Sequence, residues 1–137
     1  MRVLFCRSRA IGSVLIRALT FSRWSHVAVC INDTEAVEAT WRYVRRVPIA
    51  QIVAHHSTSE YRELPLAKDA VPFLLAQVGK HYDLSALFAV LIPNRDWATD
   101  DKWFCSELVA AAMDLFTETN RVSPQVLYLL SKPISTP

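Results

Sequence analysis

The pattern of the sequence changes about halfway along this chain, and the change limits the folds that it can adopt. As far as Leu66, short segments rich in Val, Ile, Thr and aromatic residues are separated by turn residues, which is typical of strands. Beyond Leu66, longer apolar stretches rich in Ala and Leu are typical of helices. The 137 residues are enough for one domain. We therefore expect a single α+β domain over residues 1–137, in which an antiparallel sheet packs against helices.

The boundaries of the expected elements follow from periodicity and from turn residues. The expected strands are residues 2–7, 25–31, 34–43, 44–53 (interrupted by Pro48) and 61–66. The expected helices are residues 12–20 (capped by Ser13), 69–81, 83–92, 105–117 and a short turn at 126–130.

Composition excludes several classes of protein. Only two glycines occur, so the chain has no glycine-rich loop of the kind that holds a nucleotide phosphate. The three cysteines are an odd number without a CxxC pair, which rules out a complete disulfide framework and gives no zinc or redox motif. Cys6 and Cys30 lie in apolar runs and are expected to be buried thiols. We expect neither a metal nor a cofactor.

The charge is distributed unevenly along the chain. Residues 1–46 contain eight Arg and three acidic residues, a balance of +5, whereas the remainder has a balance of −3. The simpler interpretation is a solvated rim around a half-buried sheet; the alternative is a surface for anionic partners such as lipid headgroups, with contact at a membrane surface. Nucleic acid is not expected, because no basic run is combined with stacking aromatic residues.

The sequence shows neither a secretory signal nor an apolar run long enough to span a membrane. The expected location is the cytoplasm, or release of a phage-derived protein without a signal peptide.

Cys105 stands where extended chain is expected to become a helix. The residues from Ser106 onward are mostly good helix formers. A thiol at a helix start lies near the positive end of the helix dipole and near unpaired N–H groups, and both favour the nucleophilic thiolate. Cys105 is therefore a candidate nucleophile if a histidine lies within reach.

His26 is the best histidine for this role, because a strand would hold its backbone rigidly. By contrast, His55 and His56 lie in a polar stretch typical of a loop, where we expect a solvent-facing pair. His81 is expected at the end of a helix, where it would interact with the helix dipole. A lone strand histidine can also be purely structural, so His26 needs a supporting group.

Glu38 is the best-placed group to orient the His26 imidazole, since it lies on the strand that follows. Side chains alternate along strands, so the two share a face only if the hairpin loop has an odd number of residues. A three-residue loop over 32–34 or 31–33 meets this condition, and a two-residue turn at Asn32 and Asp33 does not. The alternative for Glu38 is an ordinary exposed carboxylate.

Several segments form a combined pattern in a fixed order. They are Ser25-His26-Val27-Ala28-Val29, Val37-Glu38-Ala39, Gly79-Lys80-His81-Tyr82-Asp83, Phe104-Cys105-Ser106-Glu107-Leu108-Val109 and Ser123-Pro124 followed by Leu127. Together they resemble the circularly permuted papain-like hydrolases of the NlpC-like superfamily, and within it the YiiX-like branch. In that arrangement the histidine strand precedes the cysteine helix, as it does here.

This resemblance implies a papain-like α+β fold and a cysteine hydrolase without a cofactor. It implies Cys105 as the nucleophile, His26 as the general base and Glu38 as the group that orients the histidine. Tyr82 matches a tyrosine near the site, beside the oxyanion. Ser25 and Ser106 flank the pair, either as hydrogen-bonding support or as ordinary strand and helix residues. Glu107 is expected to be a capping or surface group.

Three functions are compatible with this pattern. The leading one is an amidase or peptidase that acts through an acyl-enzyme on cell-wall peptides or other amides. The second is a thioesterase or acyltransferase for acyl-ester lipids. The third is a non-catalytic binding module, favoured if His26 and Glu38 lie on opposite faces or if Cys105 is buried out of reach.

Overall fold

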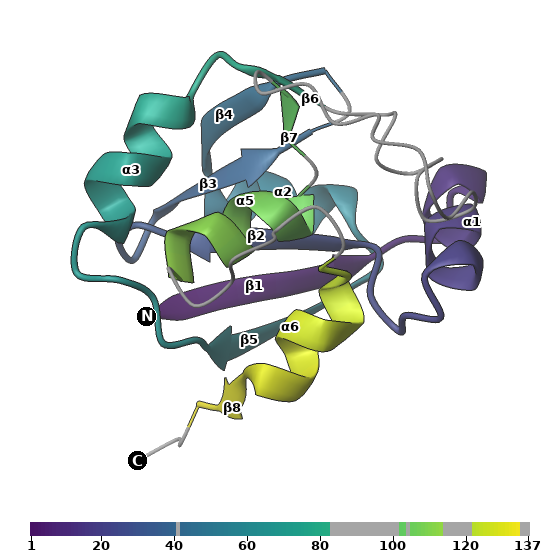
Figure 1. Ribbon diagram of the computed structural model, residues 1–137. Helices are drawn as coiled ribbons and strands as arrows, with labels where there is room; N and C mark the ends of the chain where they lie inside the picture. The colour runs from purple at the N-terminus through teal and green to yellow at the C-terminus, as the bar shows by residue number, and fades with distance from the viewer. Residues whose placement is uncertain (41, 83–101, 104, 114–121, 135–137) are drawn as a thin grey trace, which may run out of the picture.

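A six-stranded antiparallel sheet forms the centre of the molecule (Figure 1). The computed structural model describes residues 1–40, 42–82, 102–103, 105–113 and 122–134. The strand order is β4-β3-β2-β1-β5-β8. The bounds are β1 Arg2–Arg7, β2 His26–Cys30, β3 Glu35–Ala39, β4 Val44–Pro48, β5 Thr58–Glu63 and β8 Lys132–Pro133.

The described part of the chain also has five helices and a small second sheet. The helices are α1 Ile11–Leu19, α2 Ile49–His55, α3 Ala70–Gln77, α5 Cys105–Met113 and α6 Pro124–Leu130. The second sheet pairs β6 His81–Tyr82 with β7 Lys102–Trp103 in parallel. No helix within these ranges is long and apolar enough to cross a membrane. The predicted α+β class with an antiparallel sheet is confirmed.

Helices cover both faces of the central sheet. On one face, Phe5 and Val27 pack with Leu108 of α5 in the larger core cluster. On the other face, Leu4 packs with Ile52 of α2 in a smaller cluster. In Figure 1, α5 crosses in front of β2 and α2 lies behind the sheet. Alternation along the strands therefore assigns each buried apolar residue of β1 and β2 to one of two separate cores.

The strand expected over 44–53 is correct only in its first half. β4 ends at Pro48, and the chain then forms α2. Proline has no N–H for a strand ladder, and its fixed φ suits the residue before a helix. Ile49 and Ile52 lie three residues apart, so they share one helix face and are both buried. Burial against the sheet thus overrides the β-rich composition of this segment.

Several other boundaries differ from the expected ones. β5 begins at Thr58 rather than at Tyr61, and α3 ends at Gln77 rather than at residue 81. Val78 leaves the helical conformation with a ψ of 130°, and Gly79 follows with a φ of +94°. His81 is a strand residue rather than a helix residue. The helix expected over 83–92 and the end of the helix expected at 117 lie outside the described residues.

Candidate active site

The hairpin between β2 and β3 has a three-residue loop, residues 32–34. Its register pairs Ala28 with Glu38, and the Ile31 N–H donates to the carbonyl oxygen of Glu35 at 3.0 Å. The side-chain oxygen of Asn32 closes the loop by accepting the N–H groups of Thr34 and Glu35, each at 2.8 Å. The loop is odd in length, so His26 and Glu38 share a face, as the candidate site requires.

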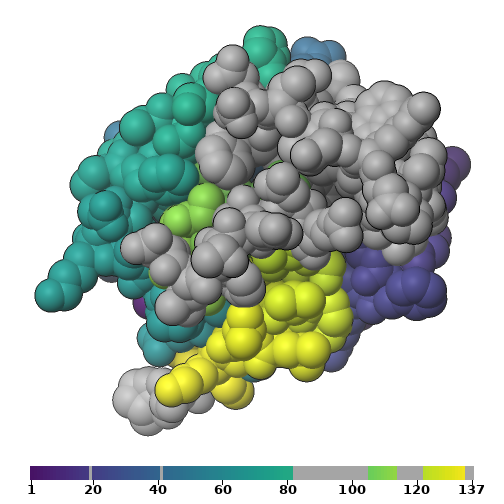
Figure 2. Space-filling model, viewed as in Figure 1, coloured from purple at the N-terminus to yellow at the C-terminus, as the bar shows by residue number. Residues whose placement is uncertain are grey.

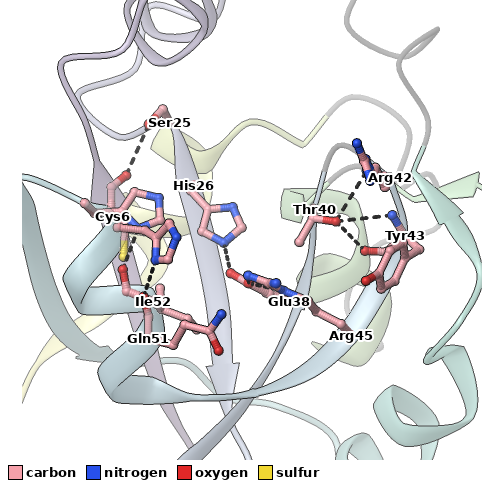
Figure 3. Close-up of polar contacts among 12 residues, drawn as sticks. Cys6, Ser25, His26, Glu38, Thr40, Arg42, Tyr43, Arg45, Gln51 and Ile52 are labelled. Atoms are coloured by element: carbon pink, nitrogen blue, oxygen red, sulfur yellow. Dashed lines mark hydrogen bonds and ion pairs between the residues drawn. The ribbon is translucent and has the colours of Figure 1, made fainter.

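Glu38 holds His26 directly (Figure 3). The Nε2 atom of His26 lies 2.6 Å from Oε2 of Glu38, and the carboxylate accepts this hydrogen bond. The other carboxylate oxygen, Oε1, accepts from Nε of Arg45 at 2.8 Å. The Glu38 side chain is 3% exposed. Glu38 is therefore a buried, doubly paired carboxylate rather than an ordinary exposed strand residue.

The electrostatics of this group favour a charged pair. Burial by itself lowers the pKa of His26, but hydrogen bonds and charge from Cys105 and Glu38 raise that pKa to about 10. Burial by itself raises the pKa of Glu38, but His26 and Arg45 lower it to about 2. Imidazolium and carboxylate are therefore the stable forms near neutral pH.

Cys105 approaches His26 from the start of α5. The polar contact and the charge of its thiol raise the pKa of the His26 imidazole. Since Nε2 of His26 bonds to Glu38, the ring nitrogen that remains for the thiol is Nδ1. Cys105 is only 2% exposed, yet it borders the same cavity as His26 and Glu38. The structure therefore brings three predicted residues, Cys105, His26 and Glu38, to one place.

The cavity beside these residues has a volume of about 520 Å³. Its walls carry hydroxyl groups from the start of the chain and from the end of β3, with basic and aromatic side chains on the side of β4. The lining residues outside the Cys105, His26 and Glu38 group include Ser8, Ser13, Ser25, Thr40, Arg42 and Tyr43. Such a cavity has room for a polar substituent next to the thiol.

His56 is not the solvent-facing residue that its polar neighbourhood predicts. Its ring stacks on His26, with 5.4 Å between the ring centroids and 2° between the planes. Its Nδ1–H donates to the carbonyl oxygen of Ile52 at 2.8 Å. Burial lowers the pKa of His56, so a neutral ring lies against the cationic His26. The spacing of Ile49, Ile52 and His56 along one helix face is the sequence signal that could have placed this ring.

Arg45 is the other site residue that the sequence did not reveal. It lies opposite Glu38 in the pairing of β3 with β4. The sequence could have shown this contact only if the register of that pair had been known.

Ser25 and Ser106, which were also predicted near the site, form hydrogen bonds within the protein. Ser25 donates from Oγ to the carbonyl oxygen of Cys6 at 3.4 Å, and the Ser13 hydroxyl lies 2.6 Å from that same Oγ. Ser13 is thus a cavity residue inside α1, not its cap. Ser106 hydrogen-bonds to the carbonyl oxygen of Val122, which ties α5 to the segment before α6.

Two further predictions concern residues near Cys105. Tyr82 belongs to β6 and pairs with Trp103, two residues before Cys105, but its side chain lies outside the described part of the structure. Glu107 is not a surface group, since it is only 5% exposed.

Cys6 and Cys30 are buried free thiols, as expected. Burial, together with the charge of Glu38, raises the pKa of Cys6 to about 12. Burial likewise raises the pKa of Cys30, against the opposing effect of Arg2. Both thiols therefore lack the setting of a nucleophile and serve as internal comparators for Cys105.

Comparison with known proteins finds a structural neighbour but no match in sequence. No family model and no curated protein matches this chain. Among solved structures, metalloprotein yiiX from Escherichia coli O157:H7, DUF1105, is similar with a TM-score of 0.72. The two chains are 20% identical, and the match covers 99% of this chain and 96% of that one.

The name of that neighbour describes a metalloprotein, and a protein holds a metal ion through a cluster of ligand side chains. Within the described ranges, no group of three or more His, Cys, Asp or Glu side chains could hold a metal ion. In the candidate site, Nε2 of His26 bonds to Glu38 and Nδ1 of His56 bonds to a carbonyl oxygen. The described residues thus do not fit a metal centre. The similarity in overall structure shows that this chain has a YiiX-like fold.

Proposed function

We propose that this protein is a cysteine hydrolase of the circularly permuted papain-like type, related to the NlpC-like superfamily. The observation that carries the proposal is the placement of His26, which bonds to Glu38 through Nε2 and borders the same cavity as the thiol of Cys105. A thiol, a base and an orienting carboxylate in this order form the minimal arrangement for nucleophilic catalysis. The order of the histidine strand before the cysteine helix also supports the permuted arrangement.

The first half of the reaction forms an acyl-enzyme. His26 already carries the proton of the Cys105–His26 pair, and the thiolate sulfur of Cys105 attacks the substrate carbonyl carbon. The backbone N–H of Cys105, in the first turn of α5, is one donor for the resulting oxyanion, and Tyr82 is a candidate second donor. His26 then protonates the departing amine or alcohol as the carbon–nitrogen or carbon–oxygen bond breaks. Glu38 stabilises the imidazolium until this proton leaves.

The second half returns the enzyme to its starting state. His26 takes a proton from a water molecule, and the resulting hydroxide attacks the thioester carbonyl. The carbon–sulfur bond breaks, the substrate leaves as a carboxylic acid, and the site returns to the pair of Cys105 thiolate and His26 imidazolium. No cofactor takes part in either step.

The substrate class proposed first is an amide or peptide, including cell-wall peptides. An amine is a poor leaving group unless it is protonated, and the raised pKa of His26 keeps its proton available for this task. The hydroxyl group of Ser8 on the cavity wall offers a hydrogen bond of the kind that a peptide backbone needs. An acyl-ester lipid is the second candidate, because exposed apolar residues of α1 lie close to the same cavity.

Trapping of the acyl-enzyme tests this function. The wild-type protein is mixed with p-nitrophenyl acetate or butyrate, and intact-mass and peptide-mapping spectra locate the acyl group. The proposal predicts an acyl group on Cys105, and a loss of turnover of roughly a thousandfold or more in Cys105→Ala. Cys30→Ala is the matched control, since it removes a buried thiol outside the site.

Unchanged turnover in Cys105→Ala, or acylation of another residue, would contradict the proposal. Comparison of N-acyl dipeptides with short-chain phospholipids then separates the two substrate classes.

A further inference from the structure

Helix α1 turns an apolar face toward solvent. Ile11 is 87% exposed, Val14 48% and Leu15 51%, and their spacing places them on one side of the helix. The opposite side makes the contacts with the protein, since Ile16 packs against the larger core cluster. The packing of α1 on the rest of the protein therefore does not use the exposed apolar face.

Phe21 continues this apolar face beyond the end of the helix, and its backbone is unusual. The N–H of Ser22 donates to the carbonyl oxygen of Arg17 at 3.0 Å, which closes the helix and places Phe21 at the position where glycine is common. Phe21 has a φ of +49° and is 92% exposed. A bulky residue in a left-handed conformation is strained, and this ring gains little packing in return. Its position suits contact with something outside the molecule.

The region around α1 is strongly basic. Residues 1–32 contain five Arg and no Asp or Glu. Arg9 and Arg23, which lie before and after α1, are both exposed. Arg2, Arg45, Arg46 and Arg62 form ion pairs with acidic residues, whereas Arg23 lies over the Trp24 ring, 5.3 Å from its centroid. An apolar helix face with flanking arginines is complementary to a surface that is apolar inside and anionic outside.

We propose that α1 and Phe21 form a docking surface for an anionic lipid bilayer. Ile11, Leu15 and Phe21 would enter the boundary between headgroups and acyl chains, while Arg9 and Arg23 meet lipid phosphates. Figure 2 shows the purple N-terminal region at the molecular surface, beside the yellow region of α6. A bilayer offers both the apolar layer and the negative charge that this face requires.

This surface is independent of the proposed hydrolase activity, but the two lie next to each other. Ser13 and Ile16, on the inner side of α1, border the cavity that holds Cys105. Docking through the outer side of α1 would therefore bring that cavity close to the membrane surface.

Vesicle co-sedimentation of the full chain tests the proposal, using phosphatidylcholine vesicles with and without phosphatidylglycerol. We expect binding to the anionic vesicles that weakens as salt is added. Leu15→Ser combined with Phe21→Ser should weaken this binding about tenfold or more, as should Arg9→Glu combined with Arg23→Glu. The matched controls are Leu129→Ser, at a side chain that is 74% exposed on α6, and Lys132→Glu on β8; both should bind like the wild type.

Circular dichroism and thermal unfolding of each variant separate loss of binding from loss of the fold. Cys105→Ala should bind vesicles like the wild type, so that failure of the catalytic proposal and failure of this one are distinguishable. The proposal is overturned if wild-type protein does not bind anionic vesicles, or if the α1 variants bind as well as the controls. It is also overturned if the protein forms a dimer that the Leu15 and Phe21 substitutions dissociate without any effect on vesicle binding, since the face would then serve a second copy of the chain.

Discussion

At the scale of single residues, the candidate site depends on a buried pair of opposite charges. His26 bonds to Glu38, and Arg45 compensates the second carboxylate oxygen. A carboxylate that is buried in this way is costly unless it is paired, so its partners explain why it can lie beneath the surface. The stack of neutral His56 on His26 further limits the orientations of the His26 ring.

This pair predicts a defined dependence of stability on pH. The pKa of His26 is raised from 6.5 to about 10, so its contribution to the free energy of unfolding is complete below about pH 6.5 and is lost as the pH rises toward 10. The pKa of Glu38 is lowered from 4.5 to about 2, so its contribution is complete above about pH 4.5 and is lost as the pH falls toward 2. Both contributions are therefore complete only between about pH 4.5 and pH 6.5.

We therefore expect Glu38→Gln to lower the free energy of unfolding most between about pH 4.5 and 6.5, by about 1–3 kcal/mol. Urea unfolding at a series of pH values measures the difference from the wild type. Glu35→Gln on the same strand is the control, because its pair with Arg46 is more exposed and should show a much weaker dependence on pH. A Glu38→Gln difference that stayed constant from pH 5 to pH 10 would contradict the charged pair.

At the scale of elements, the sequence was informative where the pattern was local. Residues from Cys105 onward are strong helix formers, and α5 does begin at Cys105. The length of the loop between β2 and β3 could not be predicted, because the turn residues are compatible with both an even and an odd number of loop residues. The side chain of Asn32 decides between them through its contacts with Thr34 and Glu35.

The sequence did not predict helix α2, because the residues of this segment are compatible with both a strand and a helix. A segment of β-branched residues after a strand suggests more strand, and only burial against the second face of the sheet favours a helix. The error carried over to His56, since its position over His26 depends on α2. Contacts between elements that are distant in sequence were therefore the part that one sequence could not supply.

The position of α2 yields a prediction about packing. Ile52 is 1% exposed in the smaller core cluster, and Ile52→Ala should lower the free energy of unfolding by about 2–5 kcal/mol. Val53 is the neighbouring control: it is 39% exposed, so Val53→Ala should change that energy by about 0.5 kcal/mol or less. Chemical denaturation measures both variants. Equal effects at the two positions would mean that Ile52 does not pack against the sheet.

At the scale of the whole molecule, the two faces of one sheet contribute different parts of the site. The even-numbered residues of β2 and β3 share the face that α2 covers, which brings His26, Glu38 and His56 together. Cys105 comes from α5 on the other face, and it reaches His26 because His26 is the first residue of its strand. The α+β class was predictable from the change of pattern along the chain. The contact between Cys105 and His26 at the end of the sheet was not predictable, because it depends on how the helices stack on the sheet.

The central claim is that His26 activates the thiol of Cys105, and the rate of alkylation tests it most directly. Wild-type protein and His26→Ala are treated with iodoacetamide at about pH 6, where an ordinary thiol is almost fully protonated. Peptide mapping then follows Cys105, Cys6 and Cys30 separately. Alanine is smaller than histidine, so a slower reaction in that variant would not come from reduced access to Cys105.

The account predicts that Cys105 reacts about tenfold or more faster than Cys6 and Cys30 in the wild type, and that His26→Ala slows Cys105 by a similar factor. Alkylation of Cys105 at the same rate with and without His26 would contradict it.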